Sequence, residues 1–277
     1  MGSHRSSSVV AAVATALAIV SRWRAEPAGQ TPAVADRTWQ PTRLSDGQPD
    51  IQGFWDLVPE GTFALYSLEG KVDAGYRLSR PSTDPVRTFR SAIVDPADGT
   101  IPYQPWAAEV AKDHFDHFTS PQGPQHLDTR TRCYLPGVPR HSYDAIHQFI
   151  QTPGYVLMMI EFNHAYRIIP MDGRPHVGAG IRLWQGDARG RWEGHTLIVE
   201  SANFNDRTWF DVVGSFHSDA LRVVERWTLA GADRIDYTAT IEDPKVFTKP
   251  WKVAFTLARN KTKDYQLLEF ACREGNK

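Results

Sequence analysis

Three carboxylates stand at positions where the alternation of apolar residues predicts an inward-facing side chain. Residues i and i+2 of a β-strand share one face of the sheet. Glu225 stands between Val223 and Trp227 in this way, and Glu161 and Glu269 occupy equivalent positions in two other apolar runs. A carboxylate buried among apolar groups needs a cationic or hydrogen-bonding partner, or its pKa is raised and it can donate a proton. Glu225 and Glu161 are therefore candidate catalytic acids or bases.

The alternative for these carboxylates is a structural ion pair that ties neighbouring strands together. The arginines that could supply such a pair are Arg167, Arg182 and Arg226. A buried ion pair holds its carboxylate ionised, whereas a catalytic acid must exchange its proton. The sequence leaves both roles open.

Two histidines lie in loops that could reach the mouth of a cavity. His176 follows a turn at 172–175, and His217 lies in the loop that leads into the Glu225 strand. Because imidazole titrates near neutral pH, either could act as a general acid or base, with a capping or surface role as the alternative. A further cluster on an expected helix suggests half of a metal site, although exposure alone explains it: Asp113, His114, Asp116 and His117. We expect no metal and no cofactor.

Aromatic and flexible apolar side chains are candidates for holding a ligand. The chain contains nine Trp, nine Tyr and 13 Phe in 277 residues, which suits an aromatic-lined cavity. The expected ligand-binding residues are Tyr237, Trp251, Phe255, Met159 and Arg167. Their apolar character predicts a hydrophobic or aromatic small molecule as the partner.

Several classes of protein lose support from what the sequence lacks. It contains no G-x-S-x-G elbow, no H-E-x-x-H helix, no P-loop and no EF-hand loop. The net charge of −1, without a long basic run, argues against nucleic acid as a partner. The oligomeric state does not follow from the sequence.

Period-two alternation separated by turn residues predicts an all-β fold. The expected strands are 51–57, 155–163, 165–170, 180–185, 194–203, 219–230, 234–243, 250–259 and 265–272. Short turns between successive strands favour an antiparallel meander, and closing such a sheet removes its exposed edges. A glycine beside a tryptophan at Gly53-Phe54-Trp55 suits the closed end of a small barrel. We therefore predict an antiparallel β-barrel.

Three further segments are expected: an N-terminal segment, a linker and an insertion within the barrel domain. Residues 1–35 contain a 12-residue apolar stretch, too short to span a bilayer, which predicts a signal peptide or an N-terminal anchor. A buried N-terminal helix is the alternative. Residues 36–50 are expected to form a linker, and 51–277 a single barrel domain. Within that domain 75–150 reads as a proline-rich insertion with a helix near 105–118.

Only two cysteines occur, Cys133 and Cys272. An exported protein with one pair of cysteines is expected to join them in a disulfide, with two free buried thiols as the alternative. We predict export to the periplasm or the medium, with no stable membrane span after processing.

Motifs distributed over residues 47–276 resemble a large family of exported bacterial proteins. They lie at 47–55, 167–176, 190–197, 224–226, 242–244, 249–251 and 272–276. The resemblance implies an all-β, calycin-like barrel similar to the lipocalins, whose opening strand also carries G-x-W, and it assigns no reaction. The chain departs from the family pattern at His195, where an acidic residue is expected.

Two functions compete on these grounds. The first is a cofactor-independent lyase, isomerase, hydratase or cyclase that acts by acid–base catalysis on a hydrophobic or aromatic small molecule in the barrel. Such chemistry needs a shaped cavity and one or two tuned acid–base groups. The second is a periplasmic carrier that binds and releases its ligand unchanged. Carboxylates among apolar faces favour the enzyme.

Overall fold

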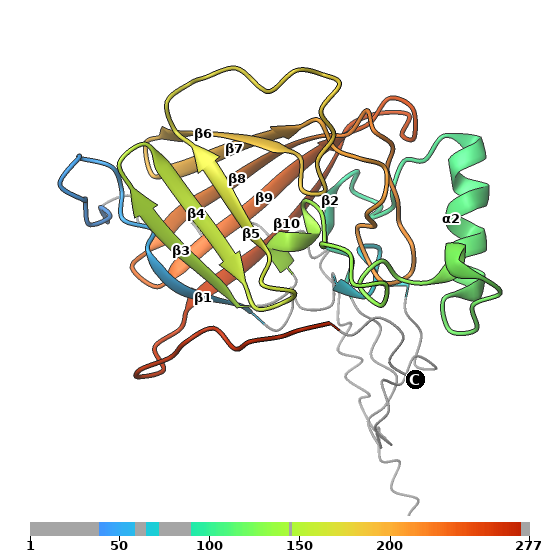
Figure 1. The fold of residues 1–277 in the computed structure, drawn as a ribbon, viewed down its shortest axis with the longest axis horizontal. Coiled ribbons are helices and arrows are strands. Elements are labelled where there is room, and N and C mark those ends of the chain that lie inside the picture. Colours follow the sequence, from blue (N-terminus) through green and yellow to red (C-terminus); the bar gives the residue numbers. More distant parts are fainter. Residues whose placement is uncertain (1–38, 59–64, 72–89, 144–145, 273–277) are drawn as a thin grey trace, which may run out of the picture. The chain divides into compact units, whose positions relative to one another are not determined.

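The strands of the computed structural model form a nearly closed antiparallel barrel (Figure 1). The structure describes residues 39–58, 65–71, 90–143 and 146–272, all within the unit 32–277. The predicted all-β fold is thus confirmed. The expected signal peptide at 1–35 and two parts of the insertion, 75–89 and 144–145, lie outside the described residues.

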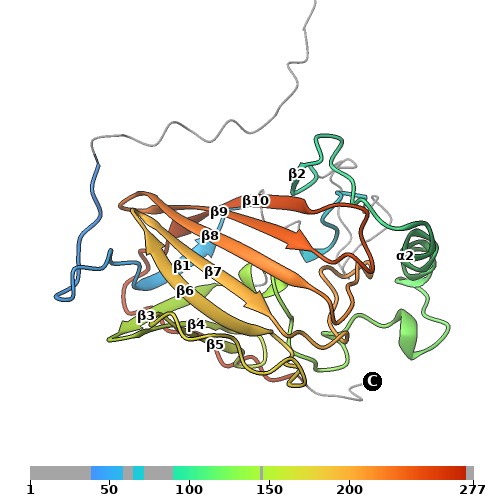
Figure 2. The same ribbon diagram turned by 90° about the horizontal axis from the view of Figure 1, so that it is seen from above.

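Nine strands follow one another around the barrel in the order β5-β4-β3-β1-β10-β9-β8-β7-β6. Their bounds are β1 Gly53–Leu57, β3 His147–Thr152, β4 Tyr155–Ile160, β5 Tyr166–Pro170, β6 Asp187–Glu193, β7 Thr196–Ala202, β8 Arg222–Gly231, β9 Arg234–Glu242 and β10 Trp251–Arg259. A tenth, β2 (Ile93–Asp95), pairs with the beginning of β10. Seen from above, β6–β10 form one wall and β3–β5 the opposite one (Figure 2).

Three described helices come from the expected insertion. Helix α2 (Pro105–His117) confirms the predicted helix, with proline in its first turn, and it lies beyond one end of the barrel (Figures 1 and 2). Two short 3₁₀ helices follow, η2 (Pro124–His126) and η3 (Arg140–Tyr143). Every residue of η3 is buried, and Tyr143 packs edge-on against Phe255 of β10. The insertion therefore contributes to the barrel core.

Strands β8, β9 and β10 present the predicted faces inward because their alternation is strict. Val223, Glu225, Trp227 and Leu229 of β8 are buried while their neighbours are more exposed. The same alternation buries Ile235, Tyr237, Ala239 and Ile241 of β9, and Trp251, Val253, Phe255 and Leu257 of β10.

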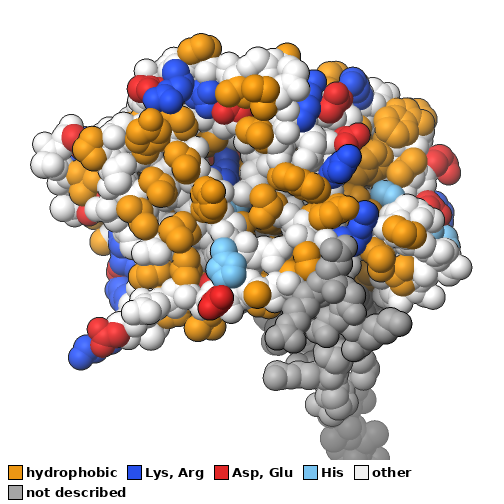
Figure 3. Space-filling model, viewed as in Figure 1, with side chains coloured by type: hydrophobic (Ala, Val, Ile, Leu, Met, Phe, Trp, Pro, Cys, Tyr) orange, Lys and Arg blue, Asp and Glu red, His pale blue; other side chains and the backbone are white. Residues whose placement is uncertain are grey.

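The predicted face of β4 is wrong. Val156, Met158 and Ile160 face the core, and Met159 lies on the half-exposed outer face. The run of five apolar residues after Tyr155 carries no alternation that could set the face. The outside of this wall is apolar as well, and Figure 3 shows apolar side chains gathered over it. Tyr166 and Ile168 of β5 are among them, each more than half exposed.

Two expected strands are absent from the described residues, and three observed ones were missed. Residues 180–185 and 265–272 make single bridges through Leu183 and Phe270 instead of strands. Strand β6 has a weak strand signal because it begins with Asp187 and contains Gly190, residue types that favour turns. Strand β3 lies inside the segment taken for an insertion, and β2 has only three residues.

Trp55 fills the end of the barrel as the Gly-Phe-Trp motif predicts. Its ring is fully buried, its Nε1 donates to the carbonyl oxygen of Ile51 at 2.9 Å, and the Arg259 guanidinium lies 4.2 Å from the ring centroid. Gly53 has φ of +107°, and a Cβ there would stand 2.9 Å from Nη1 of Arg259. Only glycine accepts both constraints.

The seam between β5 and β6 is closed by side chains. Among the described residues no ladder of hydrogen bonds joins these two strands. A methyl group on Gly190 would overlap Sδ of Met171 and lie 2.7 Å from Cγ2 of Ile169, so the glycine lets both side chains cross the seam. A separation of β5 from β6 would break no hydrogen-bonded ladder of the sheet.

Candidate functional site: a buried polar cluster behind the β5–β6 seam

Glu225 lies inside the barrel and is fully buried, as its strand position predicts. Its Oε2 accepts a hydrogen bond from Nη2 of Arg167 at 2.5 Å. Its Oε1 accepts from Oγ of Ser142 at 2.7 Å and from the Tyr237 hydroxyl at 3.0 Å. Burial, with the negative charge of Glu225 next, raises the pKa of Tyr237 well above its ordinary value. The hydroxyl therefore keeps its proton and donates it.

Arg167, which β5 presents to the interior, is the partner of Glu225. Its Nη2 also donates to Oγ of Ser201 on β7 at 3.1 Å. Nε of Arg167 is buried and has no hydrogen-bond partner among the described residues. The other two candidate partners lie elsewhere, since Arg182 pairs with Asp219 and Arg226 with Glu193 at the surface.

His141 of η3 belongs to the same cluster and has one unused ring nitrogen. Its Nδ1 lies 2.6 Å from Oε1 of Gln185, whose Nε2 donates to the carbonyl oxygen of Tyr166 at 3.0 Å. The second bond orients the amide so that Oε1 accepts, which places the imidazole proton on Nδ1. Nε2 then carries the lone pair, and it has no hydrogen-bond partner in the described part of the chain.

Burial keeps both histidines of the cluster uncharged. Loss of solvation, with the positive charge of Arg167 next, holds the pKa of His141 well below its ordinary value. Loss of solvation lowers the pKa of His147 to about 4, against the opposing effect of its hydrogen bond to the His141 carbonyl oxygen. At neutral pH the site thus combines a neutral imidazole base with a guanidinium that can stabilise a developing anion.

The site lies directly behind the seam of the barrel. Arg167 belongs to β5, and Gln185 precedes β6 by two residues. The hydrogen bond from Gln185 to Tyr166 crosses from one side of the seam to the other. A separation of β5 from β6 would therefore open a path to His141 and Arg167.

Glu161 lies outside this cluster, so the prediction that it faces the interior is wrong. It follows the end of β4 and is partly exposed. Its Oε1 accepts from the Tyr265 hydroxyl at 2.6 Å and from the backbone N–H of Leu268 at 3.1 Å. Glu161 therefore holds the C-terminal segment against the barrel. Glu269, the third carboxylate, is exposed.

The two predicted catalytic histidines are occupied by other interactions. His176 is partly exposed, and its Nδ1 lies 3.0 Å from Oδ2 of Asp187. His217 is buried and uses both ring nitrogens, one toward the Thr208 hydroxyl at 2.7 Å and the other toward the Ser218 carbonyl oxygen at 2.8 Å. Both are held by local hydrogen bonds.

Of the expected ligand-binding residues, four lie inside the barrel. Tyr237 and Phe255 stack with ring centroids 4.3 Å apart, Trp251 packs against Phe210, and Arg167 pairs with Glu225. Met159 is on the outer face. The interior is therefore rich in aromatic rings, with the polar cluster on one side of them.

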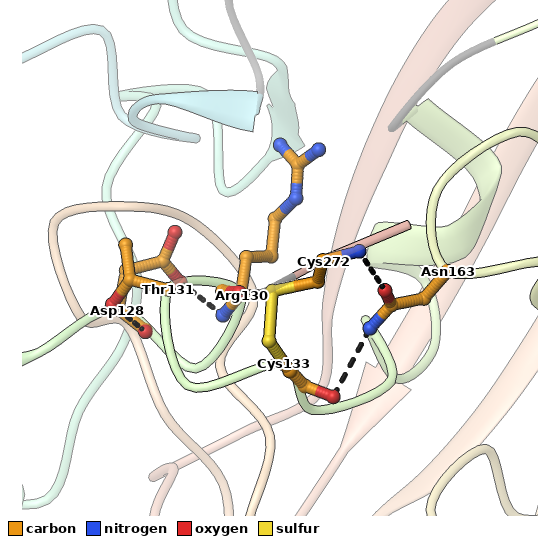
Figure 4. The surroundings of a disulfide bond; sticks show 6 residues. All are labelled: Asp128, Arg130, Thr131, Cys133, Asn163 and Cys272. Atoms are coloured by element: carbon orange, nitrogen blue, oxygen red, sulfur yellow. Dashed lines mark hydrogen bonds between the residues drawn. A yellow bond between two sulfur atoms is a disulfide. The ribbon is translucent and has the colours of Figure 1, made fainter. Parts of the chain in front are cut away.

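Cys133 and Cys272 form the predicted disulfide (Figure 4). Asn163 links its two ends, donating from Nδ2 to the Cys133 carbonyl oxygen and accepting at Oδ1 from the backbone N–H of Cys272, each at 3.0 Å. The bond joins the loop after η2 to the C-terminal segment. Such a disulfide fits an oxidising compartment. Among the described residues, no helix has the length and apolar character needed to cross a membrane.

The ionisable residues of α2 gain a partner from η2. Ligand atoms of Asp113, His117 and His126 lie within 4.8 Å of one another. However, Nδ1 of His126 accepts from the backbone N–H of Gln122 at 3.1 Å, which puts the ring proton on Nε2, 2.8 Å from Oδ2 of Asp113. A metal-bound imidazole instead donates from its other nitrogen. In this arrangement the cluster is a hydrogen-bonded tie between η2 and α2.

Sequence reasoning missed the residues that η3 and the β6 approach bring to the site: His141, Ser142, His147 and Gln185. They are separated from Glu225 by up to 84 positions along the chain. His141 and Ser142 follow Pro139 in a proline-rich segment with no strand pattern, within the predicted insertion 75–150. A buried 3₁₀ turn leaves no periodic signal of its own.

No family model matches the sequence, and no match was found among the curated proteins or the solved structures. The resemblance to exported bacterial proteins therefore stays a prediction.

Proposed function

We propose that the protein is a cofactor-independent enzyme that transfers protons on a hydrophobic or aromatic small molecule, as a lyase, isomerase, hydratase or cyclase. The observation that carries the proposal is the buried, uncharged His141 with a free Nε2 beside Arg167. Polar groups in a core lower stability unless they are fully bonded, and such exceptions concentrate at functional sites. The proposal also includes export and a calycin-like relationship of the barrel.

The roles differ from those that the strand pattern suggested. His141 is the general base, because its lone pair is available at neutral pH. Arg167 stabilises the negative charge that develops on the substrate as the proton leaves, through its unpaired Nε–H. Glu225 is a positioning residue: three donors hold its carboxylate, and it fixes the guanidinium in place.

Substrate entry is assigned to the β5–β6 seam. The aromatic interior around Tyr237 and Phe255 supplies the apolar surface for the substrate ring. Proton transfer by a positioned side chain contributes about 10²–10⁴-fold to a rate.

The test begins with mass spectrometry of metabolite extracts incubated with the purified protein. A compound that disappears as another appears identifies the reaction. His141→Gln should then lower kcat by about 10²–10⁴-fold while the protein remains folded. The matched control, His176→Gln, changes a partly exposed histidine near the other side of the seam and should keep nearly full activity. Stoichiometric retention of a compound without turnover would show a carrier and overturn the proposal.

A further inference from the structure

A cavity lies outside the barrel, beside the disulfide. Its volume is about 630 Å³, and it lies between the chain around 118–131 and the C-terminal residues 270–272. Small-molecule sites in proteins fall in the range of about 300–1,000 Å³. The cavity shares no residue with the cluster around Glu225, so it is independent of the proposed reaction.

The cavity wall is rich in aromatic rings. It includes Tyr66, Phe118, Phe162 and Phe270, with Leu127 and Val212. The rings of Phe162 and Phe270 lie 5.3 Å apart, and the Arg130 guanidinium covers Phe162 at 4.1 Å. Aromatic rings in this arrangement offer both faces and edges to another ring.

Phe270 lies half-exposed on a backbone that is fixed at its own carbonyl group and two residues further on. It is 49% exposed, and its carbonyl oxygen accepts from the backbone N–H of Asn163 at 3.0 Å. Two residues later, Cys272 is fixed by the disulfide and by Asn163. The backbone that carries the ring is therefore fixed at the cavity wall. A half-exposed aromatic ring on the wall of a cavity of this size is available to contact a ligand.

The ionisable groups at two points of the wall are already bonded to other groups. Asp128 receives both Nη atoms of Arg140, at 2.7 and 2.9 Å. His126 uses both ring nitrogens, toward Gln122 and Asp113. A ligand here gains from apolar and ring contacts, since these polar groups would lose their present bonds by turning to it.

We propose that this cavity binds an uncharged aromatic molecule of one or two fused rings, with Phe270 as the main contact. The disulfide and Asn163 keep the wall in place before the ligand arrives, which lowers the entropic cost of binding.

The test is calorimetric titration of the full chain, disulfide intact, with 2-naphthol. Saturable binding with a Kd of about 0.01–1 mM is expected for a ligand of this size. Phe270→Ala should weaken it about three- to tenfold, the usual contribution of one aromatic pair. The control is Leu268→Ala, which removes a more exposed apolar side chain from the same segment but outside the cavity wall. It should leave Kd unchanged within about twofold.

Two cavity-filling variants make the test independent of Phe270. Ala271→Trp and Thr131→Trp add an indole from opposite walls, and each should abolish binding while thermal unfolding shows a folded protein. Absence of saturable binding to the unaltered protein would overturn the proposal. So would binding that survives in both folded tryptophan variants, or binding of 2-naphthylmethylammonium as tight as that of 2-naphthol.

Discussion

Replacing Glu225 by Gln tests the buried ion pair at constant volume. In the folded protein the carboxylate accepts from Arg167, Ser142 and Tyr237. The amide keeps one accepting oxygen and replaces the other with a donor. Either orientation leaves the Arg167 guanidinium without a negative charge, in a site where its side chain is 2% exposed.

The expected loss is about 3–5 kcal/mol of unfolding free energy, the usual result when one member of a buried pair is removed. Because a pair replaced as a whole by apolar groups is often neutral, the double variant Glu225→Gln with Arg167→Met should recover most of that loss. The control uses Arg226, the residue after Glu225 on β8, which forms an ion pair at the surface. Glu193→Gln removes a carboxylate that pairs with Arg226 at 3.4 Å and with Arg191 at 2.9 Å, all at the surface, and should cost about 0–1 kcal/mol.

Urea denaturation followed by tryptophan fluorescence measures all four proteins, with ΔG taken from the transition midpoint and slope. A loss below about 1 kcal/mol for Glu225→Gln would refute the reasoning, because it would mean that water or another anion reaches Arg167. A double variant as unstable as the single one would refute it as well.

Three further predictions concern the wall, the disulfide and pH. Gly190→Ala should destabilise the protein by about 1–3 kcal/mol, because its methyl group would overlap the side chains of Met171 and Ile169 at the seam. Gly231→Ala, with its nearest atom 4.0 Å away, should cost less than about 1 kcal/mol in the same assay. Changing Cys133 and Cys272 together to Ala should cost about 5 kcal/mol on the chain-entropy model for a separation of 139 residues, and a smaller loss on reduction of the unaltered protein would contradict it. Stability should fall as pH drops from about 6.5 to 4, because the unfolded chain takes up a proton that His147, with a folded pKa of about 4, does not. His147→Gln should make that dependence less steep without removing it, because the pKa of His141 is also lowered by burial. An equal slope in both proteins would exclude His147 as a cause.

The barrel strands were predictable where strict alternation reflects one buried face and one solvent-exposed face. Strands β8–β10 show that pattern, so Glu225, Tyr237 and Trp251 were placed correctly inside. In β4 both faces are apolar, so local pattern could not choose between Met158 and Met159.

The site was predictable only in part because its remaining members meet through tertiary structure. The Glu225–Arg167 pair was one of three pairings that the sequence left open. His141 reaches Gln185 across 44 positions, from a turn without periodicity. Glu161 was misassigned because it lies just after the end of β4, where the alternation of a strand no longer decides which way a side chain faces.

The state of the His141 ring is the central claim, and ¹⁵N NMR of histidine-labelled protein measures it directly. We predict a neutral ring with its proton on Nδ1 and an unprotonated Nε2 throughout pH 7.5 to 6, assigned by comparison with His141→Gln. A ring that is protonated at pH 7, or a neutral ring with its proton on Nε2, would contradict the assignment of His141 as the base.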